Sequence, residues 1–464
     1  MKHRARLPEK SPIPALARVV SDEGGRLLVV GGWLRDQLRG APSKDLDVEI
    51  FGLRPDRISQ LLEGFESIGR VGRQFPVWQL RHQALDIGYP REAALDYSPK
   101  RPASLEQAFR AAARYRDLTV NAIGWDPLAD RWIDPFCGIA DLEAGCLRAV
   151  DSTRFGSDPL RGLRVARLHA SLEADVDDAT VDLCRRLELS EVAVERIATE
   201  LRRILLEPQR PSRAFEFLSR ADLLEIFPPV AALRGVPQDP RWHPEGDVFV
   251  HTCMVIDRAR QIGAGQGAGE REILQWAALA HDFGKPETTT RQANRVRSLG
   301  HERVGAALAR DWLIELRMSR SIVNAVEVLV AHHLAPAQFA SQGARGKAYR
   351  RLARALAVGR MTITELERVA RADHLGRTTD DARAGRFEAG KAFLAAAAAE
   401  EVAAGVRPDV VSAQTLMDRG LRPGPALGRA LARAREVQDE RGWRDPERIA
   451  ELVLAELAAK NPAR

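Results

Sequence analysis

A pair of glycines, Gly31 and Gly32, separates two strongly patterned segments near the start of the chain. An apolar run at 26–30 precedes the pair and helical spacing resumes at 33–38, so the pattern predicts a strand, a tight turn and a helix. Such a turn lets backbone N–H groups approach a phosphate closely, and Arg35 adds a positive charge one turn into the helix. Many glycine pairs are only turns, so this feature alone leaves the function open.

The next segment, 45–50, alternates acidic and apolar side chains. With the strand period of two, Asp45, Asp47 and Glu49 lie on one face. A solvated edge strand is one interpretation, although three acids on one face repel one another. The other is a Mg²⁺ site that bridges phosphate oxygens, with Asp45 and Asp47 as the expected ligands. Asp86, in a second alternating segment, is either a third carboxylate of this site or a surface acid.

Histidines cluster in the middle of the chain, where seven of the ten lie between His243 and His374. His281 and Asp282 form an adjacent pair at the end of an apolar helical segment, and His251 and Asp373 belong to other helical segments. Imidazole and carboxylate ligands suit Mn²⁺, Fe, Ni²⁺ or Co²⁺, and an open position would hold a water able to attack a phosphate. A lone histidine is commonly a core residue, but an ordered set on several helices favours metal binding.

Composition sets wider limits. The chain has 464 residues, of which 45% are hydrophobic, and a net charge of +6, which predicts three or four domains and favours a nucleic-acid partner. Four cysteines without metal-ligand spacing fit a reducing cytoplasm. No apolar run approaches the length of about 18 residues typical of a membrane span, and no signal-peptide core is evident. A cluster of basic residues with helical spacing either contacts the RNA backbone or is a solvated helix face. It consists of Arg345, Lys347, Arg350, Arg351 and Arg354.

The patterns predict an α+β chain in five parts. A basic lead at 1–23 precedes a small α/β part at 24–148, in which strand and helix patterns alternate. Helical patterns dominate from there on, in parts at 149–235 and 236–385, and an Ala-rich helical tail follows at 386–464.

Five motifs follow one another over residues 31–168: GGWLRD, KDLDVEIFG, RYRDLTVNAIGWD, DPFCGIADLEAGCLRAV and SDPLRGLRVARL. In order and spacing they resemble the class II tRNA nucleotidyltransferase and bacterial poly(A) polymerase family. The resemblance implies that 24–148 is a polymerase-beta-like nucleotidyltransferase head. It also implies that 149–235 is a helical neck that binds the nucleotide base and RNA.

The resemblance assigns nucleotide binding to Gly32, Arg35, Arg116, Asp117, Asp158, Arg161 and Arg164. It implies that Asp45 and Asp47 hold Mg²⁺ and that Asp158 and Arg161 hydrogen-bond the edge of the incoming base in place of a template. With Pro159 opening a helix, these two residues are expected to share a face, although such pairs are commonly surface ion pairs. Two positions depart from the family pattern and leave the choice of nucleotides open: Ser157 replaces Glu, and Tyr115 replaces Arg.

The histidine cluster resembles the HD-superfamily metal-dependent phosphohydrolases, whose four ligands match His251, His281, Asp282 and Asp373. His301 and either His332 or His333 stand where further ligands would permit a second metal. Lys285 either contacts phosphate or is only a charge at a helix end. The resemblance makes 236–385 an HD domain.

Both blocks together, with the WHPEG motif at 242–246 and the segment 416–431, resemble bacterial CCA-adding enzymes that carry an HD domain. This implies addition of CMP, CMP and AMP from CTP and ATP to tRNA 3′ ends, with Mg²⁺, and a second phosphohydrolase activity on RNA 3′-end phosphates. CC-only, A-only and poly(A) addition remain alternatives, as do an enzyme that is mainly an HD phosphodiesterase and a non-catalytic RNA-binding protein. The oligomeric state is open.

Overall fold

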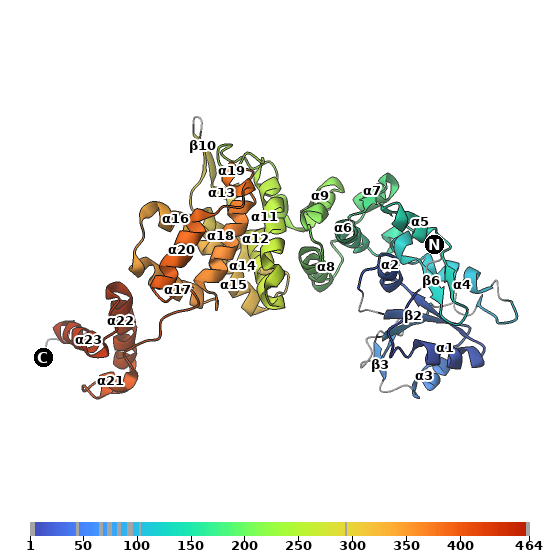
Figure 1. Cartoon of the computed structure of the whole chain (residues 1–464), viewed down its shortest axis with the longest axis horizontal. Coiled ribbons are helices and arrows are strands. Elements are labelled where there is room, and N and C mark those ends of the chain that lie inside the picture. The colour runs from blue at the N-terminus through green and yellow to red at the C-terminus, as the bar shows by residue number, and fades with distance from the viewer. Residues whose placement is uncertain are drawn as a thin grey trace. The chain divides into compact units, whose positions relative to one another are not determined.

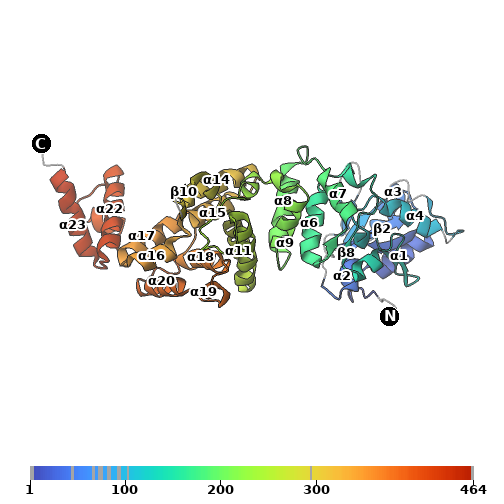
Figure 2. The same cartoon turned by 90° about the horizontal axis from the view of Figure 1, so that it is seen from above.

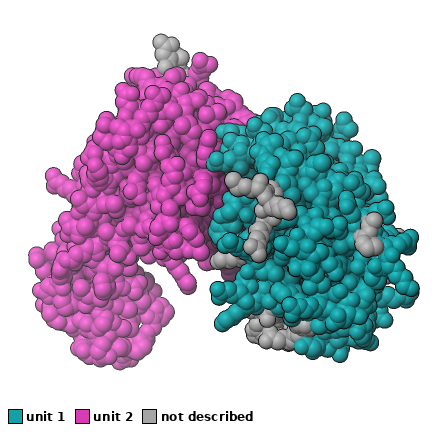
Figure 3. All heavy atoms as spheres, turned by 45° about the vertical axis from the view of Figure 1, so that its right-hand side comes forward, with its two compact units in different colours: residues 1–196, 213–226 teal, residues 197–212, 227–464 magenta. Residues whose placement is uncertain are grey.

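The computed structural model describes residues 5–42, 46–64, 68–71, 77–80, 85–90, 96–101, 104–292 and 295–460. The chain forms two compact units, one of residues 1–196 and 213–226 and the other of residues 197–212 and 227–464 (Figure 3). Asp45, predicted above as a Mg²⁺ ligand, lies outside the described residues.

The first unit contains a seven-stranded mixed sheet. Its strands are β1 (Arg26–Val30), β2 (Leu46–Phe51), β3 (Ile68–Val71), β4 (Val77–Leu80), β5 (Leu85–Gly88), β6 (Gly124–Asp126) and β7 (Arg131–Ile133). The strand order is β3-β4-β5-β2-β1-β6-β7, with β2 and β5 parallel and the other neighbours antiparallel. The strand before the glycine pair and the strand of alternating acids are therefore neighbours in the middle of the sheet.

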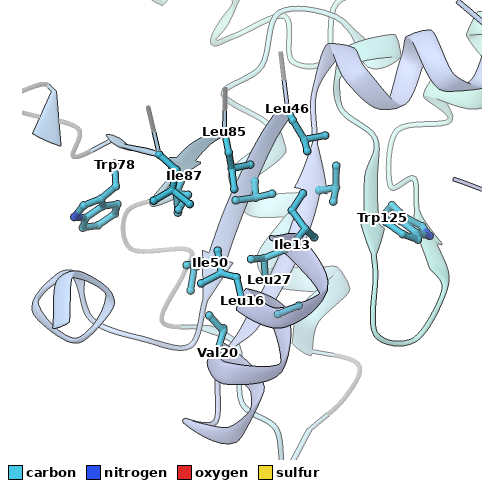
Figure 4. Close-up of a cluster of buried hydrophobic side chains, with 14 of the residues drawn as sticks. Ile13, Leu16, Val20, Leu27, Leu46, Ile50, Trp78, Leu85, Ile87 and Trp125 are labelled. Atoms are coloured by element: carbon cyan, nitrogen blue, oxygen red, sulfur yellow. The ribbon is translucent and has the colours of Figure 1, made fainter. Parts of the chain in front are cut away.

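One face of this sheet is covered by α1 (Ile13–Asp22) and α3 (Pro55–Leu62). Leu16 of α1 packs against the odd-numbered side chains of β1, such as Leu27, and the even-numbered side chains of β2, such as Ile50 (Figure 4). Each fully buried side chain of this size contributes about 1.5–3 kcal/mol to folding. The alternation predicted for β2 is confirmed, because Leu46, Val48 and Ile50 all enter this core.

The opposite face is covered by α4 (Ser104–Ala113), whose Phe109 packs with Leu28, Val30 and Phe51. Asp47 and Glu49 point to this side, since they pair in register with Val30 and Leu28. The acids are therefore kept out of the α1 core and lie where β1 ends.

The remaining elements of this unit are short and mostly helical. They are α2 (Gly32–Leu38), η2 (Thr119–Asn121), α5 (Gly138–Glu143), β8 (Cys146–Leu147), η3 (Phe155–Ser157), α6 (Arg161–Leu172), β9 (Asp175–Val176), α7 (Asp178–Arg185), α9 (Ser212–Arg220) and η4 (Leu224–Ile226). The division between the two units falls within α8 (Val194–Leu206). The helical character predicted after residue 148 is confirmed, with the short parallel pair β8–β9 as an addition.

The second unit is helical apart from one hairpin. Its elements are α10 (Pro228–Ala231), α11 (Val248–Ile262), η5 (Gly263–Gly265), α12 (Ala268–Ala280), α13 (Lys285–Thr288), β10 (Thr289–Gln292), β11 (Arg295–Ser298), α14 (His301–Glu315), α15 (Arg320–His332), α16 (Ala335–Gln342), α17 (Gly346–Ala357), α18 (Ile363–Leu375), α19 (Asp380–Arg383), α20 (Glu388–Ala399), α21 (Ala413–Met417), α22 (Pro425–Arg441) and α23 (Pro446–Lys460). α11 packs against α12 and α18, and α14 against α15 (Figures 1 and 2).

Polar residues fix where the main helices of this unit begin. The Asp247 side chain accepts a hydrogen bond from the backbone N–H of Val250 at the start of α11, and Thr362 and Glu365 form a reciprocal capping box at the start of α18. Caps of this kind satisfy N–H groups that have no partner inside the helix and are worth about 1 kcal/mol each. None of the helices in the described part of the chain combines the length and the hydropathy that a membrane span requires.

The basic cluster on α17 holds the C-terminal part of the chain. Arg350 is buried, donates to the carbonyl of Asp439 at 2.8 Å and pairs with Glu400. Arg354 pairs with Asp439 and Asp409. Two further cations of the helix, Lys347 and Arg351, both pair with Glu440. These side chains therefore bind acids of the tail, which neither of the two interpretations from sequence anticipated.

Candidate functional sites

The glycine turn and the acidic strand meet at the end of β1. Gly31 has φ 82° and ψ −154° and directly precedes α2, in a backbone region that is open essentially to glycine alone. A Cβ atom at position 31 would lie 3.0 Å from Oδ2 of Asp47. The Asp47 carboxylate therefore lies close to this turn.

A second carboxylate stands beside Asp47. In the parallel pair β2–β5, Asp47 is in register with Asp86, and both side chains are half-buried. Register partners on adjacent strands point to the same face, so the two acids are neighbours. Glu49, two positions further along β2, is engaged elsewhere, since its Oε1 accepts from Nη2 of Arg116 at 2.7 Å. Asp47 and Asp86 are therefore the described acids that could share a cation at this turn.

Asn121, in η2, connects three charged side chains of this site. Its Oδ1 accepts from Nη1 of Arg35 at 2.7 Å, its Nδ2 donates to Oδ1 of Asp117 at 2.9 Å, and its carbonyl accepts from Nη1 of Arg116 at 3.1 Å. Sequence reasoning missed this residue, although it lies four positions after Asp117 in the quoted motif. Only the folded arrangement shows which charged side chains the donor and the acceptor of its amide contact.

Asp117 is buried and remains ionised. Burial alone would raise the pKa of its carboxyl, but the charge of Arg164, whose Nε lies 2.8 Å away, and hydrogen bonds from Asn121, Arg164 and the Leu118 N–H hold the pKa well below its ordinary value. Two of the predicted nucleotide contacts, Asp117 and Arg164, are thus bound to each other.

A cavity of about 580 Å³ opens beside these residues, a size typical of small-molecule sites. Its walls include Glu49, Arg116, Tyr115, Ser157 and Asp158. Both positions that depart from the family pattern, Tyr115 and Ser157, therefore line this cavity. The side chain of Tyr115 is half exposed and carries the guanidinium of Arg154 over its ring at 4.5 Å.

Asp158 and Arg161 do not form the side-by-side pair expected from their spacing. α6 begins at Arg161 and a 3-10 turn ends at Ser157, so Asp158 stands before the helix with an extended backbone. Its carboxylate pairs with Arg196 at 3.0 Å. The buried guanidinium of Arg161 donates to the backbone carbonyls of Arg154, Phe155 and Tyr115. The expectation of a shared helix face is therefore wrong, because the first turn of α6 starts later than Pro159 suggests.

The four predicted HD ligands converge in the second unit. They come from α11 (His251), the end of α12 (His281 and Asp282) and α18 (Asp373), and all are buried. Nε2 of His251 lies 3.1 Å from Oδ1 of Asp373, and Nε2 of His281 lies 3.1 Å from Oδ2 of Asp282. His251, His281 and Asp373 form one set with metal-ligand spacing.

Asp282, His301 and His333 form a second set of this kind. His301 begins α14 and His333 directly follows α15 as its C-cap residue, and their Nε2 atoms lie 3.3 Å apart. Of the two alternatives left open above, His333 joins the cluster, whereas His332 does not belong to either set. The other expected additional ligand, His301, is present.

The orientation of the histidines suits metal binding. The Nδ1 atoms of His281, His301 and His333 lie 2.7–2.8 Å from the carbonyls of Ala278, Ser298 and Val330, respectively. A carbonyl can only accept, so each Nδ1 carries the proton and each Nε2 presents a lone pair to the centre. Ring orientation and tautomer are therefore fixed by the backbone.

Unsatisfied atoms inside the cluster point the same way. Nε2 of His281 is buried and makes no hydrogen bond, and the facing Nε2 atoms of His301 and His333 cannot both be acceptors without repulsion. Burial, with the charges of the other histidines, lowers the pKa of His333 to about 3, so this ring is neutral. A divalent cation would satisfy these groups together, so the residues fit one or two metal ions.

Three residues around the cluster were not predicted as part of it. Glu245 holds its Oε1 2.8 Å from Nδ1 of His251 and 2.9 Å from Nδ1 of His243, and Arg377 lies 3.2 Å from Asp373. A carboxylate behind a ligating histidine orients the ring and raises its basicity. The WHPEG motif contains His243 and Glu245, but their role depends on contacts that spacing does not reveal.

Lys285 lies at the cluster, with its Nζ 2.7 Å from Oδ2 of Asp282. It also donates to Oε1 of Gln238. It is the first residue of the short helix α13, after α12 has ended at Ala280. A cation within reach of the metal-binding carboxylate is suited to contact a phosphate group.

Comparisons with known proteins cover both regions. The family model of the Poly A polymerase head domain matches residues 27–148, and that of the HD domain matches residues 248–378. The Multifunctional CCA protein of Halorhodospira halophila is 34% identical over 434 residues, which is 88% of this chain and 94% of that protein. The protein of the same name from Methylobacillus flagellatus is 36% identical over 318 residues, 66% of this chain and 74% of its own.

Solved structures show a similar fold. A CCA-adding enzyme in complex with CTP has a TM-score of 0.62 at 18% identity and covers 96% of this chain and 94% of its own. The Thermotoga maritima CCA-adding enzyme complexed with tRNA has a TM-score of 0.60 at 17% identity, with 97% of each chain covered. The predicted combination of an α+β head with helical parts is thereby confirmed.

Proposed function

The chain belongs to the family of multifunctional CCA proteins, and from this premise we propose that it adds CCA to tRNA 3′ ends. CTP and ATP are the nucleotide substrates and pyrophosphate is released. The observation that carries this proposal is the contact between the glycine turn and Asp47, with Asp86 in register on the next strand. Backbone and carboxylates meet there beside a cavity large enough for a nucleotide.

We assign the chain's residues the following roles. Asp45 and Asp47, with Asp86 as a third carboxylate, would hold Mg²⁺, which when bound neutralises the triphosphate and activates the 3′-hydroxyl. Gly32 lets the backbone approach the phosphates, and Arg35 adds positive charge. Arg35 is well placed for this, because its Nη2 would lie 3.3 Å from a Cβ at position 32. Positioning and charge then account for the rate.

We assign nucleoside recognition to the cavity beside this turn. Arg116 and Asp117 would position the ribose, and Asp158 and Arg161 would read the base edge, followed by Arg164. The surface pair of Asp158 with Arg196 is worth at most about 1 kcal/mol and can open for a base. Arg161 has five N–H donors, of which three point at carbonyls, so it keeps donors for a base while its position stays fixed.

Replacement of a proposed Mg²⁺ ligand tests the main activity. We expect Asp47→Ala or Asp45→Ala to lower nucleotide incorporation into tRNA that lacks its terminus by at least about a hundredfold, because charge stabilisation of the transition state is lost. Binding of the tRNA should be retained. Glu106→Ala, which changes an exposed acid on α4, is the control and should leave incorporation intact. Incorporation that survives in Asp47→Ala would refute the role of this residue.

Incubation with single nucleotides separates the alternatives within the class. Addition of two CMP from CTP alone, followed by one AMP when ATP is present, is the expected result. CMP addition without AMP addition would indicate a CC-only enzyme, AMP addition alone an A-only enzyme, and repeated AMP addition a poly(A) polymerase. The same assay on Ser157→Glu and Tyr115→Arg tests whether these two positions change nucleotide choice.

A second activity is favoured by the metal-ligand clusters of the HD part. We propose that His251, His281, Asp282 and Asp373 hold a transition metal such as Ni²⁺, Mn²⁺, Co²⁺ or Fe and that the site hydrolyses phosphates at RNA 3′ ends. When bound, such a metal would polarise the phosphate and activate a water. The buried Nε2 of His281, which makes no hydrogen bond, and the two residue sets with metal-ligand spacing are the observations that support it.

Independent inactivation of the two sites tests this activity. We expect Asp282→Asn to abolish metal-dependent hydrolysis of adenosine 2′,3′-cyclic phosphate, because the negative charge of Asp282 helps to hold the metal. CCA addition should be unchanged, because Asp282 lies outside the nucleotidyltransferase head. Asp47→Ala should have the reverse effect. Hydrolysis that persists in Asp282→Asn would contradict the assignment.

The domain limits remain part of the proposal: a head at 24–148, a neck at 149–235, an HD domain at 236–385 and a tail at 386–464. The two family matches at 27–148 and 248–378 support the head and the HD part. We also propose that the protein is cytoplasmic. Its tRNA substrate is found there, and its four free cysteines suit a reducing compartment.

A further inference from the structure

The cavity at the HD cluster has an unusual wall. It measures about 240 Å³, and Asp282, His301, His333 and Asp373 line it. Trp242 lines it as well, and this side chain is 61% exposed. A large aromatic surface in water beside a polar cavity marks a ligand-binding position more often than a structural one. Its flat face suits a ligand with an aromatic group of its own.

Two cations on the cavity wall indicate the rest of the ligand. Lys285 and Arg377 both line the cavity and lie beside the carboxylates of Asp282 and Asp373, respectively. Ammonium and guanidinium groups next to candidate metal ligands suit phosphate oxygens. A ligand with a phosphate at the cluster and a flat ring at Trp242 is a nucleoside phosphate.

The backbone that carries the indole is held in place by its own turn. The backbone N–H groups of Trp242 and His243 both donate to the carbonyl of Asp239, at 3.0 and 2.9 Å. The carboxylate of Asp239 pairs with Arg241 at 2.7 Å, and the His243 ring is tied to Glu245. A side chain whose backbone is fixed before the ligand arrives loses less entropy on binding.

We propose that the indole of Trp242 stacks on the nucleobase of the nucleotide whose phosphate is bound at the HD cluster. This inference rests on the phosphohydrolase function proposed above and adds the residue that positions the base of its substrate. Trp242 is a positioning residue and takes no part in bond breaking. Since every base has a flat face, stacking accepts all four bases.

The hairpin beside the cavity distinguishes an RNA end from a free nucleotide. Val296 and Ser298 of β11 line the cavity, and Arg291 of β10 pairs in register with Val296, so it shares their face of the hairpin. Arg291 is exposed, and the hairpin projects from the helices (Figure 1). We therefore assign Arg291 to the backbone phosphate that precedes the terminal nucleotide, which only RNA has.

Equilibrium binding to the full-length protein tests the stacking. The probes are adenosine 2′-phosphate and glycerol 2-phosphate, which has no base. We expect Trp242→Ala to weaken binding of the adenosine probe about tenfold and to leave the glycerol probe unchanged. Trp242→Phe should stay within about twofold of the natural protein, because phenylalanine also stacks. Val358→Ala, at an exposed apolar position away from the cavity, is the control.

Fluorescence provides a readout specific to this site. Quenching by the adenosine probe should contain a component that Trp242→Phe removes without loss of affinity. If Trp242→Ala weakened binding of both probes equally, the role of Trp242 would be merely structural and the proposal would be overturned. Unchanged binding of the adenosine probe in Trp242→Ala, or no binding of this probe to the natural protein, would also overturn it. If the adenosine result holds but no substrate is hydrolysed, the phosphohydrolase function fails and the base-binding position stands.

A short RNA that ends in a 2′-phosphate tests the second contact. Arg291→Ala should weaken binding of this RNA severalfold, without effect on adenosine 2′-phosphate, since one phosphate contact is lost. Equal RNA affinity in Arg291→Ala and the natural protein would overturn the assignment to RNA ends and identify free nucleotides as the ligands.

Discussion

Asn121 shows how single residues organise the nucleotidyltransferase site. It holds Arg35 and Asp117, which otherwise come from distant parts of the chain, on the two ends of one amide. Only a side chain that both donates and accepts can satisfy a guanidinium and a carboxylate together. These two side chains are therefore connected before any nucleotide binds, which suits a reaction that depends on positioning.

The ionised state of Asp117 predicts a pH dependence of stability. Its folded pKa lies below the value of about 3.9 in an unfolded chain, so the unfolded state binds the proton more tightly. The contribution of Asp117 to the free energy of unfolding is therefore fully present above about pH 5 and is lost as the pH falls below about 4. Denaturant unfolding monitored between pH 3 and pH 7 measures it.

Asp117→Asn is the matched variant, because the amide cannot titrate. We expect it to cost about 1–3 kcal/mol near pH 7, where Arg164 loses a charged partner. The difference from the natural protein should shrink as the pH falls toward 3. A difference that stays constant over this range would show that Asp117 is not held ionised by its neighbours.

At the level of elements, the turn between β1 and α2 depends on one glycine. Gly31→Ala would strain the backbone at φ 82° and ψ −154° and push a methyl group to 3.0 Å from Oδ2 of Asp47. We expect a loss of about 1–3 kcal/mol in the free energy of unfolding and a larger loss in nucleotide incorporation. Thermal unfolding and the incorporation assay measure the two effects.

Gly40→Ala is the control for the backbone strain alone. Gly40 also has a positive φ, 67°, but a Cβ there would meet no atom within 4 Å. Its replacement should cost about 1 kcal/mol of stability and leave incorporation unchanged. If both variants lost incorporation to the same extent, contact with Asp47 would not be the reason for glycine at position 31.

Local patterns predicted elements well and tertiary contacts poorly. The alternation in β2 and the helical spacing around His251 and His281 follow from which side chains must be buried, so periodicity was sufficient there. The hydrogen-bond partners of Arg161 were not predictable, because its guanidinium donates to carbonyls of two other segments of the chain. Glu245 escaped notice for the same reason, since its role depends on a ring six positions away in sequence but only 2.8 Å away in the fold.

For the molecule as a whole, the HD cluster predicts metal-dependent stability. A metal that binds only the folded state at a free concentration of 100 times its dissociation constant stabilises by about 2.7 kcal/mol. We expect Mn²⁺ or Ni²⁺ to raise the unfolding temperature of the natural protein and a chelator to reverse the change. His281→Ala should remove this response, whereas Asp47→Ala should keep it. An equal response in His281→Ala would place the stabilising metal elsewhere.

The ion pairs of α17 affect how strongly salt weakens the binding of RNA to this protein. Lys347, Arg350, Arg351 and Arg354 already pair with acids of the same chain, so they release fewer counterions when RNA binds. The affinity for tRNA should therefore fall less steeply with rising salt than a count of basic residues suggests. The formal charge of +6 is therefore a poor guide to the number of RNA phosphates that this protein contacts.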